Sequence, residues 1–231
     1  MFKVPVSEVR RVDREGRRKL LEARSKRVRP LLDDKVLSSW NGLAISGLAY
    51  AGRVLDEPSW IEAAEKAAGF ILSHLYRDGR LLRRWRDGDS RFLGNLEDYA
   101  FLADGLIDLY EATFDGKYLS QARELAKAVV ELFNDERGGF FSTGEDETGV
   151  PVRMKDMGDG ALPSGNAIAA RVLVRLSEYY RDPRLLALAE NTVKAFSSLL
   201  KERPEAMPCM LSVVDLLARG CRGKVCLSAG S

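Results

Sequence analysis

The chain repeats one pattern of two helices three times, and this repeat constrains its fold more than any other feature. Each copy holds a nearly all-apolar helical segment, a short polar link and an amphipathic helical segment, and the copies begin at Trp40, Glu97 and Ser164. A shift of 58 residues aligns the first copy with the second, and a shift of 125 residues aligns it with the third. The aligned pairs are Gly47 with Gly105, Leu48 with Leu106, Trp60 with Tyr118 and Ala64 with Ala122, and then Asn41 with Asn166, Leu48 with Leu173, Trp60 with Leu185 and Ala64 with Ala189.

The two helices of each copy differ in how widely their hydrophobic residues are spread. The first helices, at about residues 40–55, 97–114 and 164–180, are hydrophobic around most of their circumference, which predicts burial on most sides. The second helices carry one hydrophobic stripe backed by charges, which predicts that they cover the first helices from outside. We therefore expect a layer of inner helices surrounded by a layer of outer helices.

Short strand-like runs with glycine-containing turns follow the first two outer helices, at residues 77–85 and 134–142, and both predict small β-hairpins. The fold class that we predict is all-α: a partial (α/α)6 toroid with short β-hairpins between the helical hairpins. We expect one domain over residues 1–231. Its predicted elements are a basic helix at 7–27, helical hairpins at 38–75, 97–133 and 164–200, and a final helix at 204–219.

The charge of the chain is unevenly distributed. The formal net charge is +2, yet residues 1–30 alone contain eleven Lys or Arg and four Asp or Glu. Hydrophobic residues recur at near-helical spacing among these charges, which favours a solvated helix flank over contact with an anionic partner. We do not expect nucleic-acid binding, which would show as a steep dependence of affinity on salt.

Other bulk features restrict the class of protein. The first residues lack the hydrophobic stretch of a secretory signal, and the longest uncharged run, residues 36–52, is shorter than the roughly 20 apolar residues of a membrane span. Cys209, Cys221 and Cys226 form neither a disulfide framework nor a C-x-x-C motif, and the single histidine, His74, is far from them. We expect a cytoplasmic protein without a membrane segment, metal site or cofactor.

Three polar clusters precede or open the inner helices, and they supply the candidate site. Equivalent positions of a repeat lie at one end of a ring, so we expect the clusters to converge there, with the positive ends of the helix dipoles. Carboxylates beside aromatic rings are typical of carbohydrate sites. The candidate acid and base are Asp98 or Glu97 with Asp159, and Asp34 is a further candidate. The candidate ligand-binding residues are Trp40, Asn41, Tyr99, Arg153, Lys155, Asp156, Ser164 and Asn166.

Each of these residues also has a structural explanation. Asp98 and Ser164 fit the N-cap region of a helix, and Trp40 and Tyr99 fit a hydrophobic core. The charges of residues 153–159 fit a solvated loop surface. The sequence leaves both explanations open.

Four long strings of residues resemble the spermatogenesis-associated protein 20-like, thioredoxin-domain-containing family. They are RVRPLLDDKVLSSWNG at residues 27–42, EDYAFLADGLIDLYEATFD at 97–115, GGFF at 138–141 and RMKDMGDGALPSGN at 153–166. Members of this family look like a thioredoxin-like domain joined to a toroid similar to those of six-hairpin glycosidases and sugar epimerases. We expect the chain to hold only part of the toroid, without the thioredoxin-like domain. A second copy or a partner chain would then cover the hydrophobic surface of an incomplete ring.

Two functions remain open from the sequence. The resemblance implies a carbohydrate-related protein that acts on a sugar-like small molecule through carboxylates on the toroid rim, as a glycosidase or an epimerase does. The alternative is a non-catalytic module that binds a sugar or a protein and works with the thioredoxin-like domain of longer relatives. Whether the chain is an enzyme is left undecided, because folds of this kind support several reactions.

Overall fold

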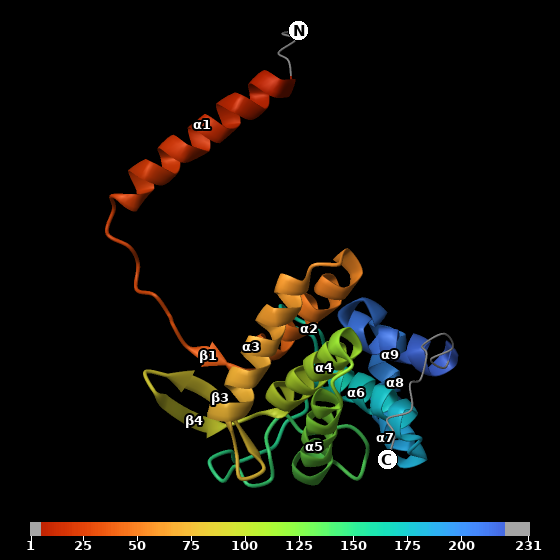
Figure 1. Cartoon of the computed structure of the whole chain (residues 1–231). Helices are drawn as coiled ribbons and strands as arrows, with labels where there is room; N and C mark the ends of the chain where they lie inside the picture. The colour runs from red at the N-terminus through yellow and green to blue at the C-terminus, as the bar shows by residue number, and fades with distance from the viewer. Residues whose placement is uncertain (1–5, 220–231) are drawn as a thin grey trace. The chain divides into compact units, whose positions relative to one another are not determined.

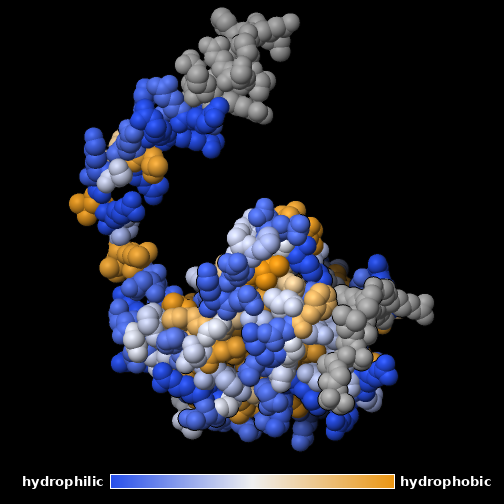
Figure 2. Space-filling view, in the orientation of Figure 1, coloured by the Kyte–Doolittle hydropathy of each residue, from blue (hydrophilic) through white to orange (hydrophobic). Residues whose placement is uncertain are grey.

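The computed structural model describes residues 6–219, and side chains from residue 13 onward. The chain divides into two compact units, residues 1–34 and 35–231, and each is described by itself. The first unit contains helix α1 (Val6–Ser25), and the surface of its described side chains, residues 13–25, is mostly hydrophilic in Figure 2. Ion pairs one turn apart join Asp13 to Arg17 and Glu15 to Lys19, each at 3.0 Å. The cysteines at positions 221 and 226 lie outside the described residues.

The second unit is built from helical hairpins packed side by side (Figure 1). The inner helices are α2 (Ser38–Leu55), α4 (Leu96–Thr113), α6 (Gly165–Tyr180) and α9 (Pro208–Arg219). The outer helices are α3 (Pro58–His74), α5 (Gly116–Phe133) and α7 (Pro183–Ala195). Each inner helix of the three hairpins packs against its own outer helix and against the next inner helix.

The links within the hairpins are short, and the connections between hairpins are long. Asp56, Phe114 and Arg181 end the three inner helices in the left-handed conformation, and one more residue leads into each outer helix. The connections between hairpins run through residues 75–95 and 134–164. Because the helices of a hairpin are antiparallel, these long connections lie at the end of the fold where the inner helices begin.

The first long connection forms a small antiparallel sheet. Strand β3 (Arg80–Arg86) pairs with β2 (Tyr76–Arg77), β4 (Asp89–Leu93) and β1 (Val36–Leu37). Asp78-Gly79 forms the tight turn between β2 and β3, and Asp87-Gly88 forms the one between β3 and β4. All four residues have positive φ, as two-residue hairpin turns of this type require. The β-hairpin predicted here is present, a second turn adds β4, and β1 from the segment before α2 makes the fourth strand.

Two details of the prediction are wrong. The hairpin predicted at residues 134–142 is reduced to one isolated bridge between Asn134 and Phe140. Gly138 and Gly139 both have positive φ, and the chain bends there against α7 and Phe196 instead of extending. The third outer helix ends early, because Phe196 is non-helical and separates α7 from the short helix α8 (Ser197–Glu202). The 3-10 turn η1 (Pro204–Ala206) then leads to α9.

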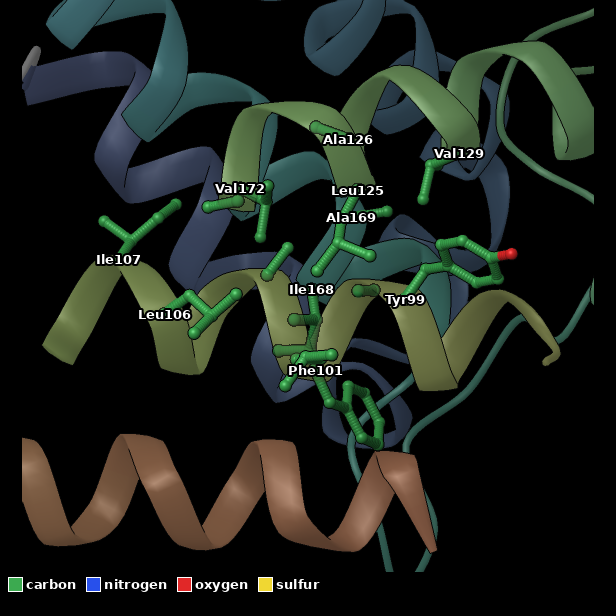
Figure 3. Packing of buried hydrophobic residues seen from close by; sticks show 14 of the residues in the cluster. Tyr99, Phe101, Leu106, Ile107, Leu125, Ala126, Val129, Ile168, Ala169 and Val172 are labelled. Atoms are coloured by element: carbon green, nitrogen blue, oxygen red, sulfur yellow. The ribbon is translucent and has the colours of Figure 1, made fainter. Parts of the chain in front are cut away.

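The hydrophobic core surrounds α4. In Figure 3, Tyr99 points from α4 toward Val129 of α5, and Phe101 points toward α2. The helices α2 and α4 approach most closely at two glycines: a Cβ added to Gly105 would lie 2.5 Å from the carbonyl oxygen of Gly42. This contact explains why glycine stands inside both helices despite its cost to helix stability.

A charged network also joins the inner helices. The Arg175 guanidinium on α6 bonds Asp104 at 2.9 Å, Asp108 at 2.7 Å and Glu111 at 2.8 Å, all on α4. The α6 side chain of Arg171 pairs with Asp104 as well. Asp108 also accepts a hydrogen bond from Ser46 of α2. Glu111 pairs with Arg53 of α2 and accepts a hydrogen bond from the Tyr179 hydroxyl of α6. Burial and a neighbouring carboxylate raise the pKa of Asp108, whereas Arg175 opposes that rise.

The structure is therefore the mostly helical, partial α/α toroid that the sequence predicts, with its small β-sheet between helical hairpins. Within residues 6–219, no helix is both long and hydrophobic enough to cross a membrane. On the face of residues 35–219 seen in Figure 2, hydrophobic residues are interspersed with hydrophilic ones.

Candidate functional site

Asp98 ties the beginning of α4 to the beginning of α2. Its side chain is fully buried, and its Oδ2 accepts a hydrogen bond from the Asn95 amide at 2.9 Å. Its Oδ1 accepts one from the Ser39 amide at 3.0 Å, and Arg83 approaches Oδ2 at 3.4 Å. Burial raises the pKa of Asp98 to about 6, and the bonds from Asn95 and Arg83 oppose this rise. Asp98 thus satisfies amides of two inner helices.

Asp159 has the same role at the next pair of inner helices. Its Oδ1 accepts from the Ser164 amide at 2.7 Å, where α6 begins, and its Oδ2 accepts from the Cys209 amide at 2.8 Å, where α9 begins. The starts of α4 and α6 are also adjacent, because a Cβ on Gly165 would lie 3.4 Å from the amide nitrogen of Glu97. The structure therefore brings together the beginnings of all four inner helices, and we call this end of the fold the rim.

Glu97 is the partly exposed carboxylate beside Asp98. Its Oε1 lies 3.0 Å from Nη2 of Arg83, and the side chain retains 31% of its exposure. The same guanidinium contacts both Glu97 and Asp98, so β3 positions one cation against two adjacent carboxylates. Arg83 was not among the candidates from the sequence, and the run Leu81-Leu-Arg-Arg-Trp85 carries no strict alternation that could have singled it out.

Asp156 is a second exposed carboxylate on the rim. Its amide donates to Oγ of Ser142 at 3.2 Å, and the backbone oxygen of Ser142 accepts from the Leu96 amide at 2.9 Å. Ser142 therefore holds the backbone of Asp156 close to the start of α4, directly before Glu97. The backbone oxygen of Asp156 also accepts from the side chains of Ser164 and Asn166.

Trp40 and Asn41 occupy the first turn of α2 beside the Ser39 contact. Trp40 is 61% exposed, which is unusual for so large an apolar side chain and excludes the core explanation. Asn41 is partly buried, and its Nδ2 donates to the backbone oxygen of Leu37 at 2.9 Å. The Asn41 side chain therefore stabilises the entry to the helix.

Three other candidates lie inside the fold. Tyr99 is fully buried, and its hydroxyl accepts from Nη1 of Arg80 at 2.9 Å and from the Leu81 amide at 2.8 Å. Asn166 is fully buried and bonds both the amide and the carbonyl of Phe140, at 2.8 and 2.9 Å. Ser164 is 1% exposed at the N-cap of α6. These contacts join the sheet and the second connection to the inner helices.

Arg153 and Lys155 lie in a pocket at the outer side of the second connection. Arg153 donates to the backbone oxygens of Thr143 and Leu132, and its guanidinium lies 4.3 Å from the ring centre of Phe141. Lys155 pairs with Asp135 at 2.8 Å, which lowers the pKa of that carboxyl. The pocket has a volume of about 380 Å³ and is lined by Asp135, Arg137, Phe141, Arg153, Met154, Lys155 and Ala195.

Asp34 is exposed at the end of the first unit, which is not placed relative to the rim. Across residues 6–219, no group of three or more His, Cys, Asp or Glu side chains could hold a metal ion. His74 stacks on Phe70 with ring centres 4.2 Å apart, at the C-terminal end of the outer helix α3.

Comparison with solved structures identifies the class of fold. The structure resembles an α-mannanase of Bacteroides thetaiotaomicron with a TM-score of 0.57 and 20% identity, over 72% of this chain and 46% of that chain. It resembles a D-mannose isomerase with a TM-score of 0.60 and 14% identity, over 83% of this chain and 56% of that chain. The fold is that of the six-hairpin glycosidase-like toroids.

Sequence comparison gives the particular relatives. The chain is 37% identical to human spermatogenesis-associated protein 20 over 93% of its own length, and 34% identical to a protein of Caenorhabditis elegans over 90%. It spans 29% of the length of each of these relatives. The resemblance to the spermatogenesis-associated protein 20-like family is thus confirmed for the segment that the chain matches. No protein-family model matches the chain.

Proposed function

We propose that the chain acts on a carbohydrate at the rim, with Glu97 and Asp156 as the carboxylates that contact the sugar. The observation that carries this proposal is the partly exposed pair of Glu97 and Arg83 at the junction of the inner helices. A carboxylate in contact with a guanidinium offers acceptors and donors to the hydroxyl groups of a sugar. Both Asp98 and Asp159 use their two oxygens on backbone amides, so they position the rim and leave the sugar contacts to their exposed neighbours.

Trp40 completes the proposed site. An exposed indole ring beside polar groups suits the apolar face of a sugar ring, as amphipathic aromatic side chains do at other binding surfaces. The fold shared with an α-mannanase, a mannose isomerase and a cellobiose 2-epimerase supports a sugar as the class of ligand. Glu97 or Asp156 would transfer the proton in a hydrolysis or an epimerisation.

The test is a panel of mono- and oligosaccharides that includes mannosides and cellobiose, measured for turnover and for binding by calorimetry. We expect Glu97→Gln and Asp156→Asn to abolish turnover and Trp40→Ala to weaken binding. The matched controls are Glu62→Gln and Trp60→Ala, which alter the same residue types on the outer helix α3. Turnover that survives both carboxylate changes would rule out this assignment.

A second candidate function is sugar binding without chemistry. It is favoured by the structural use of Asp98 and Asp159, because four of the oxygens expected to carry out catalysis already accept backbone hydrogen bonds. In this case the longer relatives would use the rim to hold a ligand for their other domains. Binding that depends on Trp40 and Glu97, with no turnover of any sugar in the panel, would select this function.

A further inference from the structure

The pocket of about 380 Å³ in the second long connection lies beside α7, and we call it the α7 pocket. Trp40, Glu97 and Asp156, which form the proposed sugar site, do not line it. Its charged lining is formed by Arg137, Arg153, Lys155 and Asp135, and its apolar lining by Phe141, Met154 and Ala195. The α7 pocket therefore combines a surplus of positive charge with an apolar wall, in a volume that suits a small organic molecule.

The charge of Arg153 is held in place by neutral groups. Its Nε donates to the backbone oxygen of Thr143 at 3.0 Å, and its Nη2 donates to that of Leu132 at 2.7 Å. Within residues 13–219 the guanidinium pairs with no carboxylate, and it lies 4.3 Å from the ring centre of Phe141. A guanidinium has five N–H donors in a planar fork that matches two oxygens of a phosphate or a carboxylate. Arg153 thus keeps its full charge and further donors for an anion.

The other two cations share a single carboxylate. Lys155 lies 2.8 Å from Oδ2 of the buried Asp135 and also donates to the backbone oxygen of Gly138 at 2.5 Å. Arg137 approaches the same Oδ2 at only 3.4 Å, and its side chain is 85% exposed. Because Lys155 compensates the charge of Asp135, the field in the α7 pocket attracts an anion. Arg137 can turn toward such an anion without breaking a buried contact.

The wall of the α7 pocket is built into the backbone. Gly138 has positive φ, and a Cβ added to it would lie 2.8 Å from the backbone oxygen of Asn191 and 3.1 Å from Cβ of Ala195. The bend is therefore packed tightly against α7, and the Lys155 bond to Gly138 ties residues 153–155 to it. A pocket that is already formed loses little free energy to ordering when a ligand binds.

We propose that the α7 pocket binds a small organic anion, whose phosphate or carboxylate group contacts Arg153 and Arg137. The apolar part of the ligand lies on Met154 and Phe141. Pairs between arginine and an oxyanion are charge-assisted and frequently bidentate, and a bare ion leaves most of the apolar wall uncovered. This binding site is separate from the sugar site proposed above and does not depend on it.

The proposal is tested by calorimetry of the full chain with inorganic phosphate, phenyl phosphate and benzoate. We expect phenyl phosphate to bind more tightly than inorganic phosphate, because its ring covers the apolar wall. Met154→Ala should weaken the binding of phenyl phosphate and leave that of inorganic phosphate unchanged. Benzoate distinguishes the two oxyanions: binding like that of phenyl phosphate assigns the pocket to carboxylates as well, and weaker binding assigns it to phosphates.

Two arginine variants test the contacts with the anion. We expect Arg153→Gln to weaken the binding of phenyl phosphate about tenfold and Arg137→Gln to weaken it about threefold, since Arg137 is more exposed. The matched control is Arg184→Gln, which should leave binding unchanged. Arg184 bonds Asp182, two residues earlier, through the same atoms that join Arg137 to Asp135, and it is 83% exposed.

The proposal is overturned if none of the three probes binds, or if Arg137→Gln binds them as tightly as the wild type. Circular dichroism shows whether Arg153→Gln folds, and if it does not, Arg137→Gln and Met154→Ala decide the question. Trp40→Ala is the control for the sugar site. A loss of phenyl phosphate binding in Trp40→Ala as large as that in Arg137→Gln would place the anion on the rim and would also overturn the proposal.

Discussion

The Ser39 amide donates a 3.0 Å hydrogen bond to Oδ1 of Asp98, and this contact joins the first turns of two neighbouring inner helices. The other oxygen of the same carboxylate accepts from the Asn95 amide. The buried Asp98 side chain thereby accepts a hydrogen bond from a backbone amide at the start of α4 and holds the start of α2 beside it. The rim depends on this carboxylate and on Asp159, which performs the same task between α6 and α9.

We predict that Asp98→Asn lowers the free energy of unfolding by about 1–3 kcal/mol, since the amide group replaces one acceptor with a donor that faces a backbone N–H. Chemical denaturation at pH 7 measures the change. The control is Asp56→Asn, because Asp56 is exposed in the left-handed conformation, which asparagine accepts readily. A loss no larger than that of the control would show that the Asp98 contacts are dispensable.

The raised pKa of Asp98 predicts a pH dependence of known sign. Its pKa is about 6 in the folded chain and 3.8 for an unperturbed aspartate, so the folded state binds the proton more tightly. Stability from this group is therefore present below pH 4 and is lost as the pH rises to about 6, by up to about 3 kcal/mol.

Denaturation of the wild type and of Asp98→Asn between pH 3.5 and 7.5 isolates this effect, because asparagine does not titrate. The stability advantage of the wild type should shrink as the pH rises through 4 to 6 and then stay level. An advantage that grows over this range would mean that the hydrogen bonds of Asp98 outweigh its burial.

Replacement of Arg175 should be the most damaging single change in the network. Arg175→Met keeps much of the side-chain volume but leaves Asp104, Asp108 and Glu111 without their shared cation. We expect a loss of about 3–5 kcal/mol in the free energy of unfolding, as for other broken buried ion pairs. Arg184→Met breaks only the solvent-exposed pair with Asp182 and should cost far less. Equal losses for the two variants would contradict the importance of the buried network.

The close approach of α2 and α4 makes Gly105 sensitive to a single methyl group. Gly105→Ala places a Cβ 2.5 Å from the Gly42 oxygen, which is backbone and cannot rotate away. We predict a loss of about 1–3 kcal/mol from overpacking. Gly69→Ala, in open space on α3, should instead gain up to about 1 kcal/mol from helix propensity. Thermal unfolding of both variants checks the difference, and an Ala at position 105 that is tolerated like the one at 69 would disprove the tight contact.

The helical layers were predictable because burial leaves a direct trace in the sequence. Helix α4 is hydrophobic on nearly all sides, and α5 carries one stripe, so their inner and outer positions follow from the pattern alone. The Asp-Gly turns of the sheet were equally visible. The bend at Gly138 and Gly139 was not, because it depends on contacts with α7, far away in the sequence.

The candidate site was predictable in position but not in the use of each side chain. The sequence placed polar residues at the starts of the inner helices, where the structure brings them together. It could not show that Asp98 points into the fold while Glu97, one residue earlier, remains partly exposed. The sequence also contained a signal for the Arg175 ion-pair network that we did not use. Asp104, Asp108 and Glu111 recur every three or four residues within a largely hydrophobic helix, and buried charges at that spacing need partners.

The unequal lengths of the connections determine where this fold can change. At the end opposite the rim, two-residue links join the helices of each hairpin. The connections at the rim already hold a sheet and a bend, and lengthening them alters the surface around Trp40 and Glu97 while the helices keep their places. New ligand preferences can therefore arise through changes in loop length that keep the contacts of Ser142 and Asp159 with the starts of the inner helices.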